Sequence, residues 1–395
     1  MKLNELVEKL AAFESGGFPV VSLYLDAKAN ENGRDEYKIW FKDEIAELSE
    51  NFEEDSAEAQ SIKQDIERIQ QFLETEVEES ANGIAIFACS GADGFFETAQ
   101  FDVAFPNNRL FAFDRPHIFP LVRIVEQNPR YAVLWSDTNK ADIYVFGGEN
   151  TINVETGKQT KVEEIENIVT NRTQVGGWSQ ARYQRHIENF HLQHAKETVE
   201  GLEKLMRDEK IEYLVLCGDE ATIMPILRPQ LSKVVEQSIV GTFNLSQYAS
   251  ENEIREKTYE VMTMQNALKD RERVERMYDT AKAAAGLGTM GVEDTLAALS
   301  NGQVEELIIS SSFEAIKYSP KKVEKVLKAY APGDDNSASD ELPEVKETRQ
   351  VSDELLIRAL NSGAKIVFIE DESLLKEANG VGAVLRYNIN ATANG

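Results

Sequence analysis

The sequence contains little cysteine and no long hydrophobic segment. Its two cysteines, Cys89 and Cys217, each end a strand-like run, and no cysteines have the spacing of a metal site or of a disulfide framework. No apolar run approaches the roughly 20 residues that cross a membrane. Residues 1–17 show an amphipathic helix pattern, without the apolar block of a signal peptide. We therefore expect a cytoplasmic protein with two buried thiols and no membrane contact.

Basic residues are also scarce. Asp and Glu number 69 against 42 Lys and Arg, which gives a formal net charge of -27. This acidity argues against nucleic-acid binding through the whole surface, although a local basic patch is compatible with it. The length of 395 residues and the hydrophobic content of 42% are typical of a globular chain with about two to four domains, each able to bury a core.

Signatures of nucleotide and hydrolase chemistry are absent from the sequence. It has no P-loop, no dinucleotide-binding fingerprint and no nucleophile elbow. Three carboxylates near strand-like runs, Asp137, Asp142 and Asp219, are interpreted as turn and cap residues rather than as a nuclease-like acid cluster. Glu293 and Asp294 begin a helix, where the helix dipole favours negative charge. We expect neither a metal nor a cofactor.

One basic, acid-poor stretch stands out, residues 175–196, with the sequence VGGWSQARYQRHIENFHLQHAK. Adjacent glycines open it, and glycine backbone can approach another molecule closely. Apolar residues then recur at helical spacing, which predicts a helix from about Ala181. The periodic residues are Leu192, Ala195, Val199, Leu202 and Met206. The stretch therefore predicts a polar loop held on a long helical stem.

The candidate RNA-binding residues of this stretch are Gly176, Gly177, Trp178, Ser179, Gln180, Arg182 and Arg185. Arginine forks match phosphate oxygens. Trp178 either stacks on a base or anchors the loop on its own domain, and the glycines alone would also suit a simple surface turn. His191 and His194 share a helix face that excludes His186, so we favour solvent or RNA contacts for these histidines over a metal.

Hydrophobic periodicity predicts an α/β chain. Asn128-Pro129 marks a boundary, because a residue before proline avoids helical conformation. We expect a helix–turn–strand start, two charged helices, three further strands, a hairpin, a third strand near Asn153, the stem helix, and a third helix–strand unit with an acidic insertion at 332–347. The expected helices lie at 3–13, 34–52, 56–75, 181–206, 224–234, 251–285, 292–301 and 351–361, and the expected strands at 19–26, 83–90, 95–103, 108–114, 131–137, 141–148, 212–218, 238–243, 303–309 and 364–370.

Several motifs resemble the archaeal and eukaryotic class-I peptide chain release factors and Pelota. In the C-terminal part, GVEDTL at 291–296 and the Gly-x-Gly-x-Val-Leu-Arg-Tyr run at 380–387 match that family at the correct separation. Gly176 and Gly177 match the glycines of the family's Gly-Gly-Gln loop. Arg182, Tyr183 and Arg185 match the Arg-aromatic-x-Arg run that follows. The glutamine is displaced, since Trp178 follows the glycines and Gln180 comes two residues later.

The resemblance covers the whole chain and implies a bacterial homologue with a three-domain release-factor/Pelota-like architecture, each domain a mixed sheet with packed helices. A decoding-site-like α/β domain would span 1–127, and it rests on topology alone. An RNase-H-like middle domain with the Gly-Gly loop would span 128–268. A C-terminal Pelota/release-factor-type domain would span 269–395.

The same resemblance implies function and partners. Relatives bind the ribosomal A site, and their glutamine tip enters the peptidyl-transferase centre and helps water cleave peptidyl-tRNA. The expected partners are therefore the ribosome with its rRNA, P-site tRNA, and elongation factor Tu or a related translational GTPase. The family's Asn-Ile-Lys-Ser tetrapeptide is missing, and its Tyr-x-Cys-x-x-x-Phe motif has only an echo in Phe87 and Cys89, so we expect no codon reading.

Three functions stay open at this point. The favoured one is a factor that fills the A site of idle or stalled ribosomes, for hibernation or rescue. The alternative is a peptidyl-tRNA ester hydrolase that acts on stalled ribosomes through the Gly-Gly-Trp-Ser-Gln loop, with Gln180 as its catalytic residue. A hydrolase of tRNA-like substrates that works without the ribosome is the third.

Overall fold

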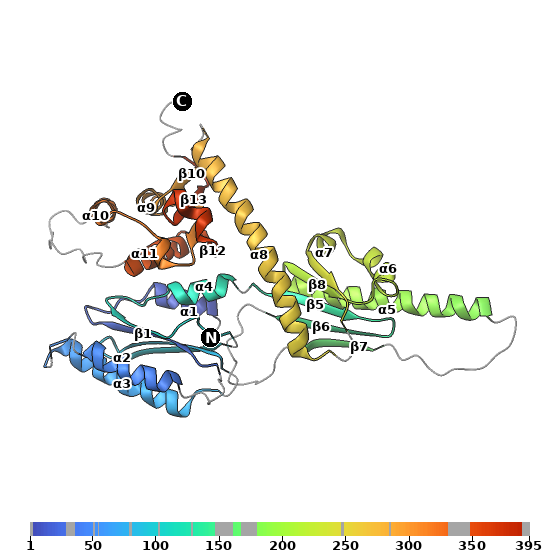
Figure 1. Ribbon diagram of the computed structural model, residues 1–395, viewed down its shortest axis with the longest axis horizontal. Coiled ribbons are helices and arrows are strands. Elements are labelled where there is room, and N and C mark those ends of the chain that lie inside the picture. Colours follow the sequence, from blue (N-terminus) through green and yellow to red (C-terminus); the bar gives the residue numbers. More distant parts are fainter. Residues whose placement is uncertain are drawn as a thin grey trace. The chain divides into compact units, whose positions relative to one another are not determined.

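The chain forms three sheets with packed helices, in two compact units (Figure 1). The computed structural model describes residues 3–28, 36–49, 52–53, 55–78, 81–101, 103–127, 129–146, 161–166, 180–245, 249–283, 286–330 and 348–388. Unit 1 contains the described residues up to 127 and those from 269 onward. Unit 2 contains the described residues between 129 and 268. The predicted α/β class is confirmed, and two of the three sheets are mixed as expected, whereas the N-terminal sheet is wholly antiparallel.

The N-terminal part of unit 1 is an antiparallel sheet with helices on both faces. Its elements are α1 (Leu3–Ala11), β1 (Val20–Asp26), α2 (Glu36–Ser49), α3 (Ala57–Thr75), β2 (Gly83–Cys89), β3 (Phe95–Phe101), β4 (Arg109–Phe113) and α4 (Phe119–Gln127). The strand order is β3-β2-β1-β4. Successive strand residues point to opposite faces. Leu23 therefore packs against α2 and α3, and its neighbour Tyr24 packs on the side of α1 and α4.

The C-terminal part of unit 1 is a smaller mixed sheet. Its elements are the end of α8 (Glu251–Lys282), β10 (Gly288–Met290), α9 (Val292–Ser300), β11 (Val304–Ser310), η2 (Phe313–Ala315), α10 (Pro320–Ala329), α11 (Thr348–Asn361), β12 (Lys365–Ile369), η3 (Glu372–Ala378) and β13 (Val381–Leu385). The order is β10-β13-β11-β12, and only β11 and β12 pair in parallel. The predicted glycine stops are present, since Gly302 and Gly363 both end helices at positive φ.

The first and last parts of the chain share one hydrophobic core within unit 1. Helix α4 packs against α11 and β12, and the rings of Phe119 and Phe368 meet edge to face at 5.1 Å. Asp353 of α11 accepts hydrogen bonds from the backbone N–H groups of Ile118 and Phe119, at 3.1 and 3.0 Å. Its other oxygen lies 2.6 Å from Nδ1 of the buried His117. Burial raises the pKa of Asp353. A carboxylate from the C-terminal part thus caps the start of an N-terminal helix.

Unit 2 is a five-stranded sheet with a hydrophobic cluster on each face. Its elements are β5 (Tyr131–Ser136), β6 (Lys140–Phe146), β7 (Lys161–Glu166), α5 (Gln180–Asp208), β8 (Tyr213–Cys217), α6 (Met224–Leu227), η1 (Arg228–Gln230), α7 (Lys233–Gln237), β9 (Ile239–Phe243) and the first part of α8. The order is β7-β6-β5-β8-β9, with β5, β8 and β9 parallel. Helices α5 and α6 cover one face, and α8 covers the other.

Some expected elements differ from the structure. The single helix expected at 224–234 is three short helices, because Pro229 has no N–H to donate and the Ser232 side chain caps a new helix at Val235 N. Helices α4 and α10 and strand β10 were not expected. Asn153 and the acidic insertion at 332–347 lie outside the described residues, and the third strand of the hairpin sheet is β7.

Both cysteines are buried free thiols, as expected, and burial raises the pKa of Cys217 to about 12. Among the helices that the structure describes, none combines the length and the apolar character of a membrane span.

Candidate functional site

Helix α5 is the stem that the sequence predicted. It has 29 residues, so at 1.5 Å per residue it is about 43 Å long. Its second half is held by apolar contacts with the sheet, through the fully buried Ala195 and Leu202 and through Val199 and Met206. Arg130 pairs with Glu209 at 2.7 Å just beyond the end of the helix. The stem is therefore anchored along its C-terminal half.

The N-terminal half of α5 stands clear of the sheet. Asn189 and Phe190 are exposed, and complete burial begins only at His194. From Gln180 to His194 the helix rises about 21 Å. Figure 1 shows this end of α5 continuing past the edge of the sheet of unit 2. The anchored half thus holds the start of the helix away from the sheet of unit 2.

The predicted site residues divide between this helix and the segment before it. Gly176, Gly177, Trp178 and Ser179 lie outside the described residues. Gln180 is the first residue of α5. Arg182 and Arg185 follow in the first two turns, three residues apart. Residues at this spacing are neighbours on a helix surface, and a helix N-terminus carries partial positive charge. This end of α5 therefore suits an anion such as a phosphate group.

The histidines of α5 have different environments. His194 is fully buried, and neither of its ring nitrogens makes a hydrogen bond of good geometry with the described residues. Burial lowers its pKa, while the Lys140 backbone and the nearby Asp137 act in the opposite direction. His191 is only half-buried. In the described part of the chain, no three His, Cys, Asp or Glu residues come together as a metal site would require.

The carboxylates near the strands of unit 2 do not form a common site. Asp137 accepts from the backbone N–H groups of Asn139 and Lys140, each at 2.7 Å, and so shapes the β5–β6 turn. Asp219 accepts from Ala221 N at 2.8 Å in the same way. Asp142 differs from its expected role, because it is a buried residue within β6, 3.4 Å from Lys140 Nζ. The turn-and-cap interpretation is therefore correct for two of the three.

The C-terminal motif has a structural role. The Arg386 guanidinium donates to the carbonyl of Gly363 at 2.9 Å, and the Tyr387 hydroxyl donates to Asn301 O at 3.1 Å. Both contacts satisfy carbonyl groups at the ends of helices. Gly380 has φ +83, and a Cβ there would lie 2.5 Å from Ala315 O, so only glycine fits. These residues hold the C-terminal sheet and its helices together.

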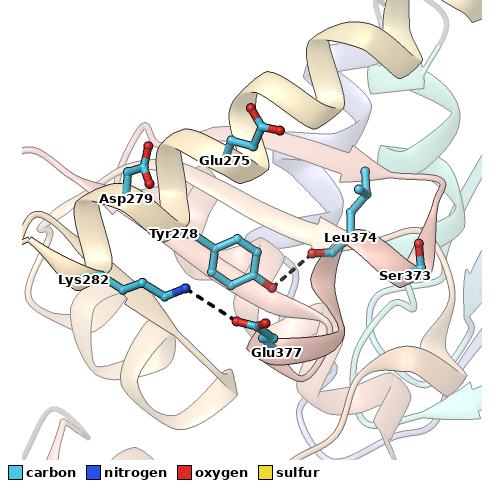
Figure 2. A pocket seen from close by; sticks show the side chains of 7 residues that line it. All are labelled: Glu275, Tyr278, Asp279, Lys282, Ser373, Leu374 and Glu377. Carbon is cyan, nitrogen blue, oxygen red and sulfur yellow. Dashed lines mark hydrogen bonds and ion pairs between the residues drawn. The ribbon is translucent and has the colours of Figure 1, made fainter.

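A cavity of about 350 Å³ lies elsewhere, between α8 and η3 of unit 1. Figure 2 shows its polar lining engaged within the protein: the Tyr278 hydroxyl donates to Leu374 O at 3.0 Å, and Lys282 pairs with Glu377 at 3.6 Å. Glu275 and Asp279 add negative charge. This hollow has no feature of a reaction centre, so the end of α5 remains the candidate site.

Comparison with known families bears on both units. Residues 116–263 match the family described as bacterial archaeo-eukaryotic release factor family 10, and residues 267–389 match eRF1 domain 3. The chain is a bacterial archaeo-eukaryotic release-factor-like protein. The resemblance noted from the sequence is therefore confirmed, and α5 lies inside the family-10 match.

Curated relatives of this release-factor-like protein are similar over its whole length. Peptide chain release factor subunit 1 of Thermococcus kodakarensis is 23% identical over 428 residues, which cover 98% of each chain. Eukaryotic peptide chain release factor subunit 1 of Saccharomyces cerevisiae is 27% identical over 235 residues, 54% of each chain. Among solved structures, a ribosome-bound archaeal Pelota described with ABCE1 is 13% identical, covers 98% of this chain and 94% of its own, and has a TM-score of 0.42.

Sequence reasoning missed two features of this release-factor-like protein. The first is the contact of Asp353 with His117 and α4, which no local pattern reveals. The second is helix α10, with four lysines in ten residues. The segment PKKVEKVLKA carries the signal for α10, since its apolar residues Val323, Val326 and Leu327 recur at helical spacing.

Proposed function

We propose that this protein is a ribosome-binding translation factor that occupies the A site of idle or stalled ribosomes, in hibernation or rescue, without reading a codon. The observation that carries the proposal is the stem: α5 begins at Gln180, about 21 Å of helix before complete burial starts at His194, and Arg182 and Arg185 lie in its first two turns. The curated relatives are peptide chain release factors, and one structural neighbour is a ribosome-bound Pelota.

The chemistry of the stem end suits ribosomal RNA. Guanidinium groups form paired hydrogen bonds with phosphate oxygens, and two of them occupy the first turns of α5. The rest of the protein is strongly acidic, with a net charge of -27, so most of its surface is repelled by RNA. A local basic contact at the end of a long arm would orient such a protein on a polyanion. The partners we propose are rRNA of the A site and the peptidyl-transferase centre, P-site tRNA, and elongation factor Tu or a related GTPase as carrier.

Binding without codon reading is supported by the N-terminal sheet. Phe87 and Cys89, the echo of the family's codon motif, are both fully buried in β2. Their side chains pack inside unit 1 and therefore cannot contact a codon in this fold. Together with the missing tetrapeptide, this favours occupancy that is independent of the A-site codon.

The hydrolase alternative has weaker support. Gln180 begins α5, so its backbone belongs to the helix and not to a loop tip. Two residues, Trp178 and Ser179, separate it from the glycines, and in extended backbone two residues span roughly 6 to 7 Å. Ester hydrolysis requires placement of the working group within about an ångström. We therefore propose a binding role for the arm.

Co-sedimentation with purified ribosomes over a salt series tests this function. The double variant Arg182→Glu/Arg185→Glu should bind about tenfold or more weakly and with a flatter salt dependence, because two phosphate contacts are lost. The matched control is Lys196→Glu/Lys204→Glu, which reverses two exposed charges on the anchored half of α5. Equal loss in both variants would show that only net charge matters and would remove the arm from the interface.

A second arm of the experiment varies the codon. Ribosomes that carry a stop codon, a sense codon or no codon in the A site should retain the protein alike. A preference for stop codons of tenfold, about 1.4 kcal/mol, would contradict the proposal and restore a role in termination.

A further inference from the structure

Helix α10 of unit 1 has a basic face that no part of the proposed function uses. Residues 316–330 contain five lysines and a single glutamate, in a chain whose net charge is -27. Lys321, Lys322, Lys325 and Lys328 are all exposed. At 100° per residue these four positions lie within about a third of the helix circumference. The sequence therefore concentrates positive charge on one side of a short helix.

The opposite side of α10 fixes its orientation. Val323 is almost completely buried, and Val326 and Leu327 pack against the core that the first and last parts of the chain share. Asn301 at the end of α9 donates to the Tyr330 hydroxyl at 3.1 Å, which ties the C-terminal end of α10 down. Because the apolar side is packed against the core, the lysine side of the helix faces solvent.

Neighbouring acidic groups leave most of this charge uncompensated. Glu324 pairs with Lys328 at 2.9 Å. Glu293 of α9 accepts instead from the backbone N–H of Ser319, at 2.9 Å. Within the described part of the chain, Lys321, Lys322 and Lys325 form no ion pair. Among the described residues, these three exposed cations therefore have no acidic partner.

We infer that the lysine face of α10 is a second RNA-binding surface, which holds the phosphate backbone without reading sequence. Phosphate contact needs only point charges on flexible stems, which lysine provides. A protein partner would need apolar or aromatic anchors, and protein interfaces are depleted in lysine. No large apolar residue lies among the four lysines on this face. The identification of the RNA as ribosomal rests on the proposed function, whereas the surface itself does not.

Binding of free RNA by the full-length chain tests this inference. The probe is a labelled single-stranded RNA of mixed sequence, about 20 nucleotides long, followed by anisotropy between about 50 and 200 mM salt. In the variant Lys321→Gln/Lys322→Gln/Lys325→Gln, the slope of log affinity against log salt should fall by about 2, since each phosphate contact on a single strand contributes about 0.7. Affinity at the lowest salt should fall about tenfold. The lysines face solvent, so the melting temperature should not change.

The matched control removes the same charge elsewhere. Lys63, Lys204 and Lys257 are exposed lysines on three other helices, and their triple change to Gln should leave the slope as in the wild type. An equal loss in both triple variants, or no loss in the α10 variant, overturns the inference. Polyglutamate of matched charge that competes as well as RNA would assign the face to acidic proteins instead. Free RNA binding that depends on α10 while ribosome binding fails would refute the proposed function and leave this surface intact.

Discussion

Two buried histidines, one in each unit, have different surroundings. In unit 1, the buried His117 meets the carboxylate of Asp353, which also caps α4, so the polar groups tie two distant parts of the chain together. In unit 2, neither ring nitrogen of the buried His194 makes a hydrogen bond of good geometry with the described residues, although the Lys140 backbone lies near enough to raise its pKa. A satisfied buried group specifies a fold, whereas an unsatisfied one is a place where the fold is easily loosened.

This difference indicates which residues of each unit stabilise the fold and which ones could bind a partner. The motif residues of the C-terminal part, such as Arg386 and Gly380, are used up by internal contacts. In α5, by contrast, Asn189 and Phe190 are exposed and complete burial begins only at His194, and we propose that the helix start binds a partner. Unit 1 is therefore best probed through stability, and the arm of unit 2 through binding.

The largest effect is expected from Asp353→Ala. The change leaves His117 without its carboxylate and α4 without its cap, in a site that water does not reach. Breaking a buried polar pair of this kind costs about 3 to 5 kcal/mol. Chemical denaturation should therefore show an early transition for unit 1, with the transition of unit 2 unchanged.

The control for this prediction is Asp371→Ala. Asp371 also caps a helix, since its side chain accepts from Ser373 N at 3.0 Å, but it does so from an exposed position. We expect a much smaller shift for this variant. Similar shifts of the unfolding transition in both variants would contradict the prediction. They would mean that the contact of Asp353 with the N-terminal part contributes no more stability than an exposed helix cap.

This contact also explains the limits of prediction from sequence. The periodic apolar residues of α3 and of the anchored half of α5 are a local signal, and both helices lie where the sequence placed them. Helix α4 was missed because its cap, Asp353, comes from a residue far along the chain. Local rules cannot supply a partner of that kind. Helix α10 was missed although its pattern is local.

The sequence predicted the candidate site only in part. The sequence placed Arg182 and Arg185 at the start of a long helix from about Ala181, and the structure confirms that helix, with Gln180 as its first residue. Polar residues follow the same periodicity in a helix end that lies on a sheet and in one that extends beyond it. The sequence therefore could not show that the first half of α5 extends beyond the sheet. The roles of Gly176 and Trp178, outside the described residues, stay predictions.

The second prediction concerns pH, to which the two units should respond with opposite sign. In unit 1, burial raises the pKa of Asp65 to about 6, although Ser90 donates to it at 2.5 and 2.7 Å. The folded state then holds a proton that the unfolded state releases. The stabilising contribution is complete below pH 3.8 and is lost as pH rises to about 6. This difference amounts to about 3 kcal/mol.

In unit 2 the burial of His194 lowers its pKa, so the folded state binds its proton less well than the unfolded chain. Stability from this site is complete above pH 6.5 and is lost as pH falls through the lowered value. Denaturation between pH 4 and 8 should show a smaller loss of stability with falling pH in His194→Gln. In Asp65→Asn, the loss of stability as pH rises from 4 to about 6 should be smaller. Slopes that match the wild type in both variants would contradict this assignment.

The smallest effect is expected from Gln180→Ala. The change leaves the arginines of the arm in place, so affinity for ribosomes should stay within about twofold, or roughly 0.4 kcal/mol. Peptide release should be slow in both the wild type and the variant. The reason is geometric: a release loop must hold its amide beside an ester that the ribosome fixes, and the backbone of Gln180 is part of the helical stem.

Single-turnover release of labelled peptide from purified ribosomal complexes measures this, with an active release factor as the positive control. Alanine is a good helix former, so the variant keeps the start of α5. A change in the rate of peptide release would therefore not be due to loss of the helix. Fast release by the wild type that collapses in Gln180→Ala would show that the helix start opens on the ribosome and returns the amide to the tip. The start of α5 would then take part in catalysis through Gln180. The proposal that unit 2 only binds the ribosome would be wrong for this residue.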